Sequence, residues 1–228
     1  MVGLHSGLER TRGPYSKPIS AMILCAGRGE RLGSLTRKTP KPMVRVGGYP
    51  VISWIFNHLA QHGVQEIIVN IHHQPLQLIE YLGSMVYYSA ETKLMGTAGA
   101  FKKISWWLSD PFIVCNGDTI TNVDIGTMVR MHQDSKAIAT VFTHKTLTHN
   151  GGVFVFSKKV MECIPSNKPY SIHKDLIPEL VKDKQLITKY TDIDSYYYDI
   201  GTPEGLRRAR KFFKDEKPNP MSKLRAAG

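Results

Sequence analysis

The 228-residue sequence predicts an α/β fold, a three-layer sandwich in which helices cover both faces of a mostly parallel, partly mixed central sheet. Short apolar runs typical of buried strands alternate with amphipathic runs typical of helices. Strict alternation of strand and helix favours a parallel sheet covered on both faces. Further strands follow in the second half of the chain, where we expect the sheet to be mixed.

Each element follows from its own stretch of sequence. The apolar runs ISAMIL, EIIVNI, VYYSA and FIVCN predict strands at 19–24, 66–71, 86–90 and 112–116. Amphipathic runs predict helices at 51–63, 75–83, 96–108 and 123–133. Further strands are expected at 137–143, 151–157, 186–191 and 195–200, and further helices at 171–183 and 203–213. Ligands of such sheets bind outside the carboxyl ends of the strands, so we expect chemistry in the loops that follow strands.

Length and composition bound the organisation of the chain. A chain of 228 residues with 42% hydrophobic content can bury one substantial core, and we expect a single domain at 19–213. The polar segments 1–18 and 214–228 are punctuated by Pro and Gly and are expected to be flexible. No apolar stretch reaches the length of a spanning helix, and the start lacks a signal-peptide pattern, so we expect a cytoplasmic protein. The three cysteines are widely spaced and typical of buried thiols in a reducing compartment.

The charge of the chain favours anionic partners. Thirty Lys and Arg against nineteen Asp and Glu give a formal net charge of +11, which suits nucleotides, sugar phosphates, nucleic acid or a membrane surface. Charge alone does not choose among them. A nucleic-acid-binding module predicts a basic stripe, whereas the basic residues singled out below gather in one loop.

The stretch LCAGRGERLGSLTRKTPKPM, residues 24–43, follows the first expected strand. Gly27 and Gly29 let the backbone approach a ligand and turn its N–H groups inward, which suits phosphate oxygens. The same loop carries five cations: Arg28, Arg31, Arg37, Lys38 and Lys41. A tight turn with solvated charges is the alternative, and for a bare G-x-G it would be favoured. The spacing fits neither a P-loop nor the dinucleotide fingerprint, whose third glycine is displaced here by one residue.

This stretch resembles the signature of sugar-1-phosphate nucleotidyltransferases, which runs G-x-G-x-R-L-x-P-L-T and, after a short spacer, P-K-P. Ser34 departs from it, because the signature has proline there. The resemblance implies a Rossmann-like fold and the transfer of a nucleoside monophosphate from a nucleoside triphosphate to a sugar 1-phosphate, with release of pyrophosphate. It also implies catalytic roles for Arg31, on the triphosphate, and for Lys41, at the reacting centre. Prolines on both sides of Lys41 restrict its backbone and help to aim the ammonium.

A second segment, ETKLMGTAGAFKKI, resembles the family's E-x-x-x-L-G-T-A-G-A segment, which holds the nucleobase and ribose. A helix that opens at GTAGA would offer small residues and free N–H groups to a ring or a phosphate. A glycine-rich helix start without a ligand is the alternative reading of this segment alone. Its threonine-alanine-glycine form is familiar from guanylyltransferases, which favours GTP as the donor and mannose or heptose phosphates as acceptors. Together the two motifs imply a set of nucleotide-binding residues: Leu24, Ala26, Gly27, Gly29, Glu91, Gly96, Thr97 and Ala98.

Two carboxylates, Asp118 and Asp199, each end an apolar strand. Two hard oxygen ligands near a triphosphate suit Mg²⁺, which takes one or two carboxylates and keeps several waters. Asp118 could instead cap a turn, and Asp199 could cap the last helix, although Thr202 before Pro203 is the better cap. The resemblance places metal-binding aspartates at both positions, so we expect Mg²⁺ as the cofactor.

The acceptor side of the expected site is where the resemblance thins. Family members carry a long strand-rich insertion where this chain has only residues 143–149, so Lys145 is either a remnant of the family's glutamate-lysine pair or part of a plain surface loop. His173 replaces a family glutamate, so a carboxylate that would bind the sugar is missing and the identity of the sugar stays open. The residues implied in acceptor binding are Asn116, Lys145, Asn150, Gly152 and Lys174.

Several alternatives remain open at this stage. The enzyme could use UTP, CTP or dTTP, could accept a phosphate that is not a sugar phosphate, or could be an inactive nucleotide-binding homologue. We expect a nucleoside triphosphate and a phosphorylated sugar as partners, with neither nucleic acid nor a membrane, and a homo-oligomer is compatible with the sequence. His72 and His73 are expected at a strand end or in a loop, and Tyr196 and Tyr198 on one face as core and pocket wall.

Overall fold

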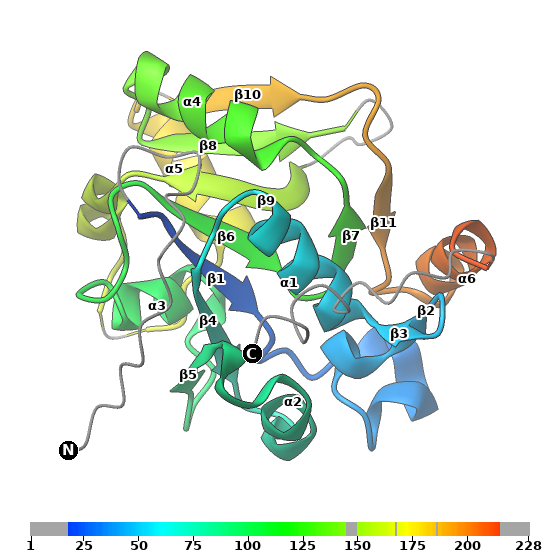
Figure 1. Cartoon of the computed structure of the whole chain (residues 1–228). Helices are drawn as coiled ribbons and strands as arrows, with labels where there is room; N and C mark the ends of the chain where they lie inside the picture. The colour runs from blue at the N-terminus through cyan, green and yellow to red at the C-terminus, as the bar shows by residue number, and fades with distance from the viewer. Residues whose placement is uncertain (1–17, 145–149, 167, 186, 215–228) are drawn as a thin grey trace, which may run out of the picture.

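The computed structural model describes residues 18–144, 150–166, 168–185 and 187–214. A seven-stranded sheet forms its centre, in the order β10-β8-β9-β6-β1-β4-β5 (Figure 1). The single domain expected at 19–213 stays a prediction, and the segments 1–18 and 214–228 lie outside the described residues except for residues 18 and 214. The strands of this sheet are β1 (Ser20–Leu24), β4 (Glu66–Ile71), β5 (Tyr87–Ala90), β6 (Phe112–Asn116), β8 (Ala139–Thr143), β9 (Asn150–Phe156) and β10 (Ile187–Thr191).

The expectation of a mostly parallel, partly mixed sheet is confirmed. Strand β1 is parallel to both of its neighbours, β4 and β6, and the pairs β4/β5 and β8/β10 are also parallel. Strand β9 is antiparallel to β6 and to β8. The start of β9 therefore lies at the same edge of the sheet as the ends of β1 and β6, and the loops at that edge can form one site.

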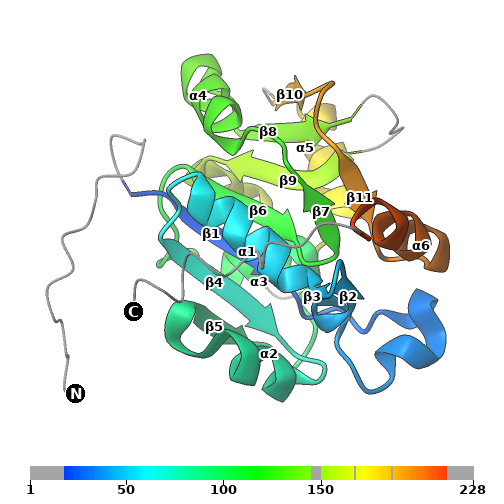
Figure 2. The same cartoon turned by 45° about the vertical axis from the view of Figure 1, so that its right-hand side comes forward.

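Helices cover both faces of the sheet, as expected of a three-layer sandwich. One apolar cluster joins the sheet to α1 (Val51–Gln61), α2 (Pro75–Leu82) and α4 (Ile125–Ser135). The second joins the opposite face to α3 (Gly96–Lys103) and α5 (Ile177–Lys182). Figure 2 shows α1 and α4 on the same side of the strands. Alternation along β1 explains the two clusters, since Ile23 belongs to the first and Met22 to the second.

Two smaller pieces build the edge where the strands end. The loop after β1 contains two 3₁₀ helices, η1 (Glu30–Thr36) and η2 (Lys41–Met43), and continues into a short hairpin of β2 (Arg45–Val46) and β3 (Tyr49–Pro50). Strand β7 (Thr119–Thr121) pairs antiparallel with β11 (Tyr197–Asp199), which leads into α6 (Pro203–Phe212). This pairing carries the end of the chain back to the residues that follow β6, as Figure 1 shows.

Two expected helices differ from the observed ones. The helix expected at 96–108 ends at Lys103, and the chain continues in turns that keep both Ile104 and Leu108 buried. The helix expected at 171–183 opens with a π-helical turn, η5 (Ile172–Leu176), before α5. In the described part of the chain, no helix has the length and apolarity needed to cross a membrane.

We predict that Gly151→Ala destabilises the fold. A Cβ on Gly151 would lie 2.3 Å from Cδ1 of the buried Phe142, and overpacking of this kind typically costs roughly 1–3 kcal/mol. For a chain of this size that lowers the melting temperature by several degrees. Gly27→Ala is the control, because its Cβ would meet nothing within 4 Å. Equal melting temperatures for the two variants would contradict this prediction.

Candidate functional site

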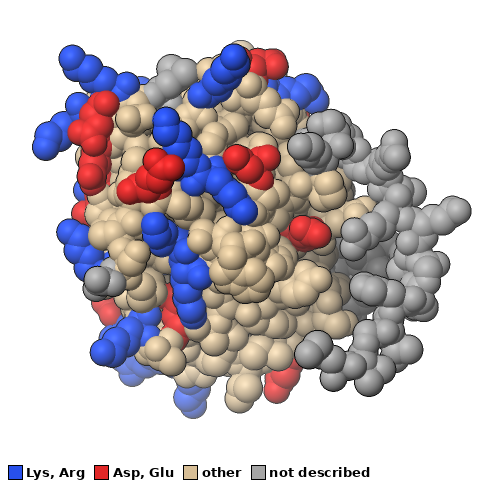
Figure 3. Space-filling model, turned by 90° about the vertical axis from the view of Figure 1, so that its left-hand side faces the viewer, with Lys and Arg blue, Asp and Glu red and all other residues tan. Residues whose placement is uncertain are grey.

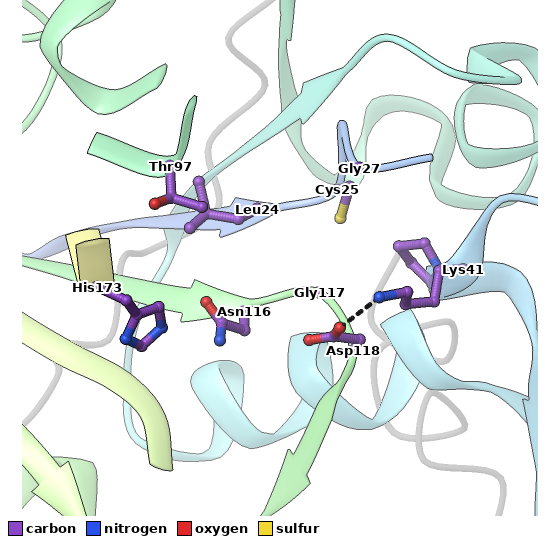
Figure 4. A pocket seen from close by; sticks show the side chains of 10 residues that line it. Leu24, Cys25, Gly27, Lys41, Thr97, Asn116, Gly117, Asp118 and His173 are labelled. Atoms are coloured by element: carbon purple, nitrogen blue, oxygen red, sulfur yellow. Dashed lines mark hydrogen bonds and ion pairs between the residues drawn. The ribbon is translucent and has the colours of Figure 1, made fainter. Parts of the chain in front are cut away.

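A pocket of about 160 Å³ lies at the carboxyl ends of β1 and β6 (Figure 4). It is built from four segments that are distant in the sequence: the loop after β1, the loop after β6, the start of α3 and the turn η5. Its location follows the rule for open α/β sheets, whose ligands bind beyond the ends of the strands. The lining residues are Leu24, Cys25, Gly27, Lys41, Pro42, Thr97, Asn116, Gly117, Asp118 and His173.

An ion pair between Lys41 and Asp118 spans one side of the pocket (Figure 4). The Lys41 Nζ lies 2.8 Å from the Asp118 Oδ2, and both side chains are largely but not fully buried. Pro40 and Pro42 flank Lys41 at the start of the 3₁₀ helix η2, and Pro42 is buried. The ammonium is therefore held on a short rigid segment and points into the pocket.

Asp199 and Arg31 reach the same point from other elements. A Cβ placed on Gly201 would lie 2.8 Å from Oδ1 of Asp199, 2.9 Å from Nη2 of Arg31 and 3.2 Å from Oδ2 of Asp118. The N–H of Ile200 donates to the Asp118 carbonyl oxygen at 2.9 Å, which locks β11 beside the loop after β6. Two carboxylates and two cations thus converge around Gly201, beside one end of the pocket. Lys41 and Asp118 line the pocket, whereas Asp199 and Arg31 do not.

Asp199 is not the cap of the last helix. Thr202 caps α6, since its Oγ1 accepts from the Gly205 N–H at 3.1 Å, and Pro203 begins the helix. Oδ1 of Asp199 accepts from the Gly201 N–H at 2.6 Å and turns the carboxylate toward Asp118. Burial, together with repulsion from Asp118, raises the pKa of Asp199 above its ordinary value.

The donor set fits a hard divalent cation. Asp118 and Asp199 supply acceptor oxygens at one point, and their mutual repulsion is relieved by added positive charge. Among the described residues there is no group of three or more His, Cys, Asp or Glu that could hold a metal ion. Two carboxylates are the number that suits an ion whose remaining ligands are waters and phosphate oxygens.

Comparison with known proteins shows the family of the chain. The family model described as nucleotidyl transferase matches residues 20–151, which is more than half of the chain and holds Arg31, Lys41 and Asp118. The chain belongs to the nucleotidyl transferase family. The resemblance drawn from the residues 24–43 is thereby confirmed.

Three relatives show how far the likeness within this family extends. A UTP–glucose-1-phosphate uridylyltransferase from Synechocystis sp. is 30% identical over 80% of this chain, which spans only 60% of that relative's length. A D-glycero-alpha-D-manno-heptose 1-phosphate guanylyltransferase from Aneurinibacillus thermoaerophilus is 27% identical over 85% of this chain and 97% of its own. The crystal structure of HddC from Yersinia pseudotuberculosis superposes with a TM-score of 0.72 at 25% identity and covers 86% of this chain and 99% of that chain.

The start of α3 corrects one expectation. The N–H groups of Ala98 and Gly99 are not free for a ligand, because both donate to the Tyr170 carbonyl oxygen, at 2.8 and 3.2 Å. Gly96 packs against the backbone of Tyr170 as well, and a Cβ on Gly96 would lie only 2.6 Å from the same oxygen. Of the three residues named from GTAGA, Thr97 lines the pocket, and its Oγ1 accepts from the Ile172 N–H at 2.7 Å.

Other nucleotide residues named from the motifs support the pocket rather than line it. Ala26 is buried, and Gly29 takes a left-handed turn with φ of 69° whose carbonyl oxygen accepts from Thr36. Glu91 is 6% exposed, and its carboxylate accepts from Asn70 and from the Met95 N–H. The pocket itself receives Leu24 and Gly27 from this group, together with Thr97.

The acceptor residues named from the sequence divide in the same way. Asn116 lines the pocket, and a Cβ on Gly152 would lie 2.9 Å from its Nδ2, so these two are neighbours. Lys174 is exposed and does not line the pocket, whereas the preceding His173 does and packs its ring edge-on against Phe154. Asn150 begins β9 and pairs with Thr143, but its side chain, like all of Lys145, is outside the described residues.

Four lining residues were not predicted as site residues: Cys25, Pro42, Gly117 and His173. Gly117 had a signal in NGD, and the structure gives its reason, since a Cβ would lie 2.5 Å from the Leu24 carbonyl oxygen. His173 was visible only as a departure from the family. Cys25 follows the last residue of β1 directly, and burial strongly raises the pKa of its thiol.

The residues set aside as structural have structural surroundings. His72 Nδ1 lies 2.7 Å from the Glu91 carbonyl oxygen in the loop after β4. Tyr196 and Tyr198 share one face and pack on Phe212 and Phe213. On the face of the molecule shown in Figure 3, basic and acidic side chains are intermixed, which is not the arrangement of a basic stripe.

We predict that Asp199→Asn stabilises the protein at pH 7 in chelator. The raised pKa means that the ionised carboxylate is disfavoured in the fold, so its penalty is present above the folded-state pKa and disappears as the pH falls to the ordinary value for aspartate, about 3.9. The variant keeps an acceptor for the Gly201 N–H. Its melting temperature should exceed that of the wild type at pH 7 and converge with it near pH 4.

Asp124→Asn is the matched control with the opposite sign. Burial opposes ionisation of Asp124, but hydrogen bonds from Thr127 outweigh it and lower the pKa of this carboxyl. Removal of its charge should therefore lower the melting temperature at pH 7. A fall for Asp199→Asn as well would contradict the repulsion between Asp118 and Asp199.

Proposed function

We propose that the protein transfers a nucleoside monophosphate, GMP from GTP, to a sugar 1-phosphate and releases pyrophosphate. The single observation that carries this proposal is the convergence of Lys41, Arg31, Asp118 and Asp199 at one end of the pocket, since Lys41 and Arg31 stand in the family signature. Charges of both signs at one point suit a reaction between two phosphates.

The chemistry asks little of the protein beyond positioning and charge. An oxygen of the sugar phosphate is already anionic at neutral pH, so it needs no general base to attack the α-phosphorus. A new bond forms between that oxygen and the phosphorus while the bond to the bridging oxygen of pyrophosphate breaks. Lys41 and Arg31 would bring the two anions together and stabilise the charge that develops on pyrophosphate.

Asp118 and Asp199 would hold Mg²⁺, which supplies positive charge to the phosphate oxygens when it is bound. Support comes from the two convergent carboxylates and from the raised pKa of Asp199. The ion pair of Lys41 with Asp118 supports this proposal as well, since it holds the ammonium beside one of the two carboxylates. Phosphates that enter would therefore meet the ammonium and the carboxylates side by side.

The base and the acceptor are chosen from the relatives that match over their whole length. The heptose-phosphate guanylyltransferase is covered to 97%, and together with GTAGA it favours GTP and a mannose- or heptose-type 1-phosphate. The runner-up is uridylyl transfer from UTP, which is favoured by the relative at 30% identity. Besides Lys41 and Asp118, the pocket offers the polar side chains of Thr97, Asn116 and His173 to the substrates.

The proposal predicts that pyrophosphate appears only when a triphosphate, a phosphorylated sugar and Mg²⁺ are all present. A matrix of GTP, UTP, CTP and dTTP against mannose, heptose and glucose 1-phosphates, read by pyrophosphate release, tests this directly. GTP should give the highest kcat/KM. A several-fold preference for another base with every acceptor would contradict the choice of GTP, and undiminished release in excess chelator would remove the metal from the reaction.

A second prediction concerns Lys41→Ala. This variant should stay folded and lose at least about tenfold in kcat, because one tenfold step is about 1.4 kcal/mol of barrier and a charge on reacting phosphates is worth more than that. Lys159→Ala is the matched control, since Lys159 is exposed and remote from the pocket lining. Pyrophosphate assays and melting curves on both variants decide it. Near-equal activity of the two would mean that Lys41 is not at the reacting centre.

A further inference from the structure

A chain of three hydrogen bonds, two of them buried and the third partly buried, connects the two motif segments behind the pocket. The Cys25 N–H donates to the Asn70 Oδ1 at 2.6 Å, and the Asn70 Nδ2 donates to the Glu91 Oε1 at 2.7 Å. The Met95 N–H donates to the Glu91 Oε2 at 2.9 Å. Cys25 follows β1, Asn70 lies near the end of β4, Glu91 follows β5 and Met95 precedes α3. The chain of bonds therefore crosses three neighbouring strands.

The direction of every bond in this chain is fixed. The backbone N–H groups of Cys25 and Met95 can only donate, and an ionised carboxylate can only accept. Asn70 must therefore turn its oxygen to Cys25 and its amide nitrogen to Glu91. An asparagine is the neutral side chain of this length that can accept on one side and donate on the other. A substitution at Asn70 or Glu91 alone that exchanges a donor for an acceptor therefore loses one of these hydrogen bonds.

The side chains in this chain of hydrogen bonds are buried, and burial of polar groups costs free energy. Asn70 is 4% exposed and Glu91 is 6% exposed. A buried carboxylate is costly unless it is paired or fully hydrogen-bonded. Of the ion pairs found between described residues, none involves Glu91, and its two oxygens are satisfied by Asn70 and Met95. The Glu91 carboxylate thus connects the loop after β1, through Asn70, to the segment before α3.

The two ends of the chain are the two segments that the proposed function assigns to the nucleotide. Cys25 lines the pocket at the start of the loop that carries Arg31 and Lys41, and Met95 directly precedes Gly96 and Thr97 at the start of α3. The Glu91 N–H also donates to the Ile71 carbonyl oxygen at 2.9 Å, which ties the loop before α3 to the end of β4. Asn70 and Glu91 are absent from the pocket lining themselves.

We infer that Asn70 and Glu91 are positioning residues that fix the distance between the triphosphate-binding loop and the base-binding segment. The inference rests on the proposed function. When both segments are held in advance, contacts to the base add to contacts to the triphosphate without a further cost of ordering. When they move independently, the base contributes less to the binding of the whole nucleotide.

An exchange of the two side chains tests this inference. Asn70→Asp alone sets two carboxylates against each other, and Glu91→Gln alone leaves either the Met95 N–H or the Asn70 amide facing a donor. In the double variant Asn70→Asp/Glu91→Gln, the new carboxylate accepts from the Cys25 N–H and from the new amide, whose oxygen accepts from the Met95 N–H. All three bonds and the total charge are kept, with the middle bond reversed.

The measured quantity is the contribution of the base to binding. Dissociation constants for GTP and for inorganic tripolyphosphate, both with Mg²⁺, are obtained by calorimetry. The ratio of the Kd for tripolyphosphate to the Kd for GTP reports that contribution. Each single variant should lower the ratio about tenfold, which is about 1.4 kcal/mol. The double variant should return it to within about twofold of the wild type, as a double-mutant cycle requires of a direct partnership.

Thr140→Val is the matched control for a loss of stability alone. Thr140 is fully buried on β8, and its hydroxyl lies 2.9 Å from the His132 Nδ1, so this variant also breaks a buried hydrogen bond but should leave the ratio unchanged. If the single variants do not fold, the double variant still decides the matter, because a folded double variant with a lowered ratio overturns the inference. Unchanged ratios in both single variants overturn it as well. A wild type that binds neither ligand overturns the proposed function instead, together with everything built on it.

Discussion

Two carboxylates that repel each other, Asp118 and Asp199, have to be held together at one end of the pocket, and much of the structure serves that constraint. The β7/β11 pairing and the bond from the Ile200 N–H to the Asp118 carbonyl oxygen bring them together from opposite ends of the chain. The aromatic packing of Tyr196 and Tyr198 on Phe212 of α6 anchors the strand that carries Asp199. Lys41 offsets part of the repulsion by its ion pair with Asp118.

The sheet gives this constraint its setting. Because β1 and β6 are parallel neighbours, the loop with Lys41 and the loop with Asp118 leave the sheet at the same edge. The antiparallel strand β9 brings Gly152 to that edge by its start rather than its end. Behind the pocket, Asn70 and Glu91 tie the two motif segments across β4. The charged side chains thus lie on loops at the ends of the strands, and hydrogen bonds of Asn70 and Glu91 to backbone N–H groups hold these loops in place.

The sequence predicts the local pattern of this protein better than its long-range contacts. The strands at 66–71 and 112–116 have the expected bounds, because their apolar runs are sharply ended by polar residues. The occupation of the Ala98 N–H by the Tyr170 carbonyl oxygen could not be foreseen, since that contact joins segments far apart in the chain. The same holds for Asn70, whose partners Cys25 and Glu91 are 45 and 21 residues away. Asp118 and Asp199 are predicted as metal ligands because strand ends and the family pattern both mark them, and the structure brings the two carboxylates together.

The account is tested most directly by binding of Mn²⁺, a substitute for Mg²⁺ whose electron paramagnetic resonance signal changes when it is bound. In the presence of a non-hydrolysable GTP analogue, the wild type should bind the ion, and Asp118→Asn and Asp199→Asn should each weaken that binding by at least about tenfold, since each removes one of only two protein carboxylates. Asp192→Asn, which alters a carboxylate that is not among the groups around Gly201, should bind as the wild type does. Equal Mn²⁺ affinity in all four proteins would contradict the claim that the two aspartates hold a metal ion beside the nucleotide.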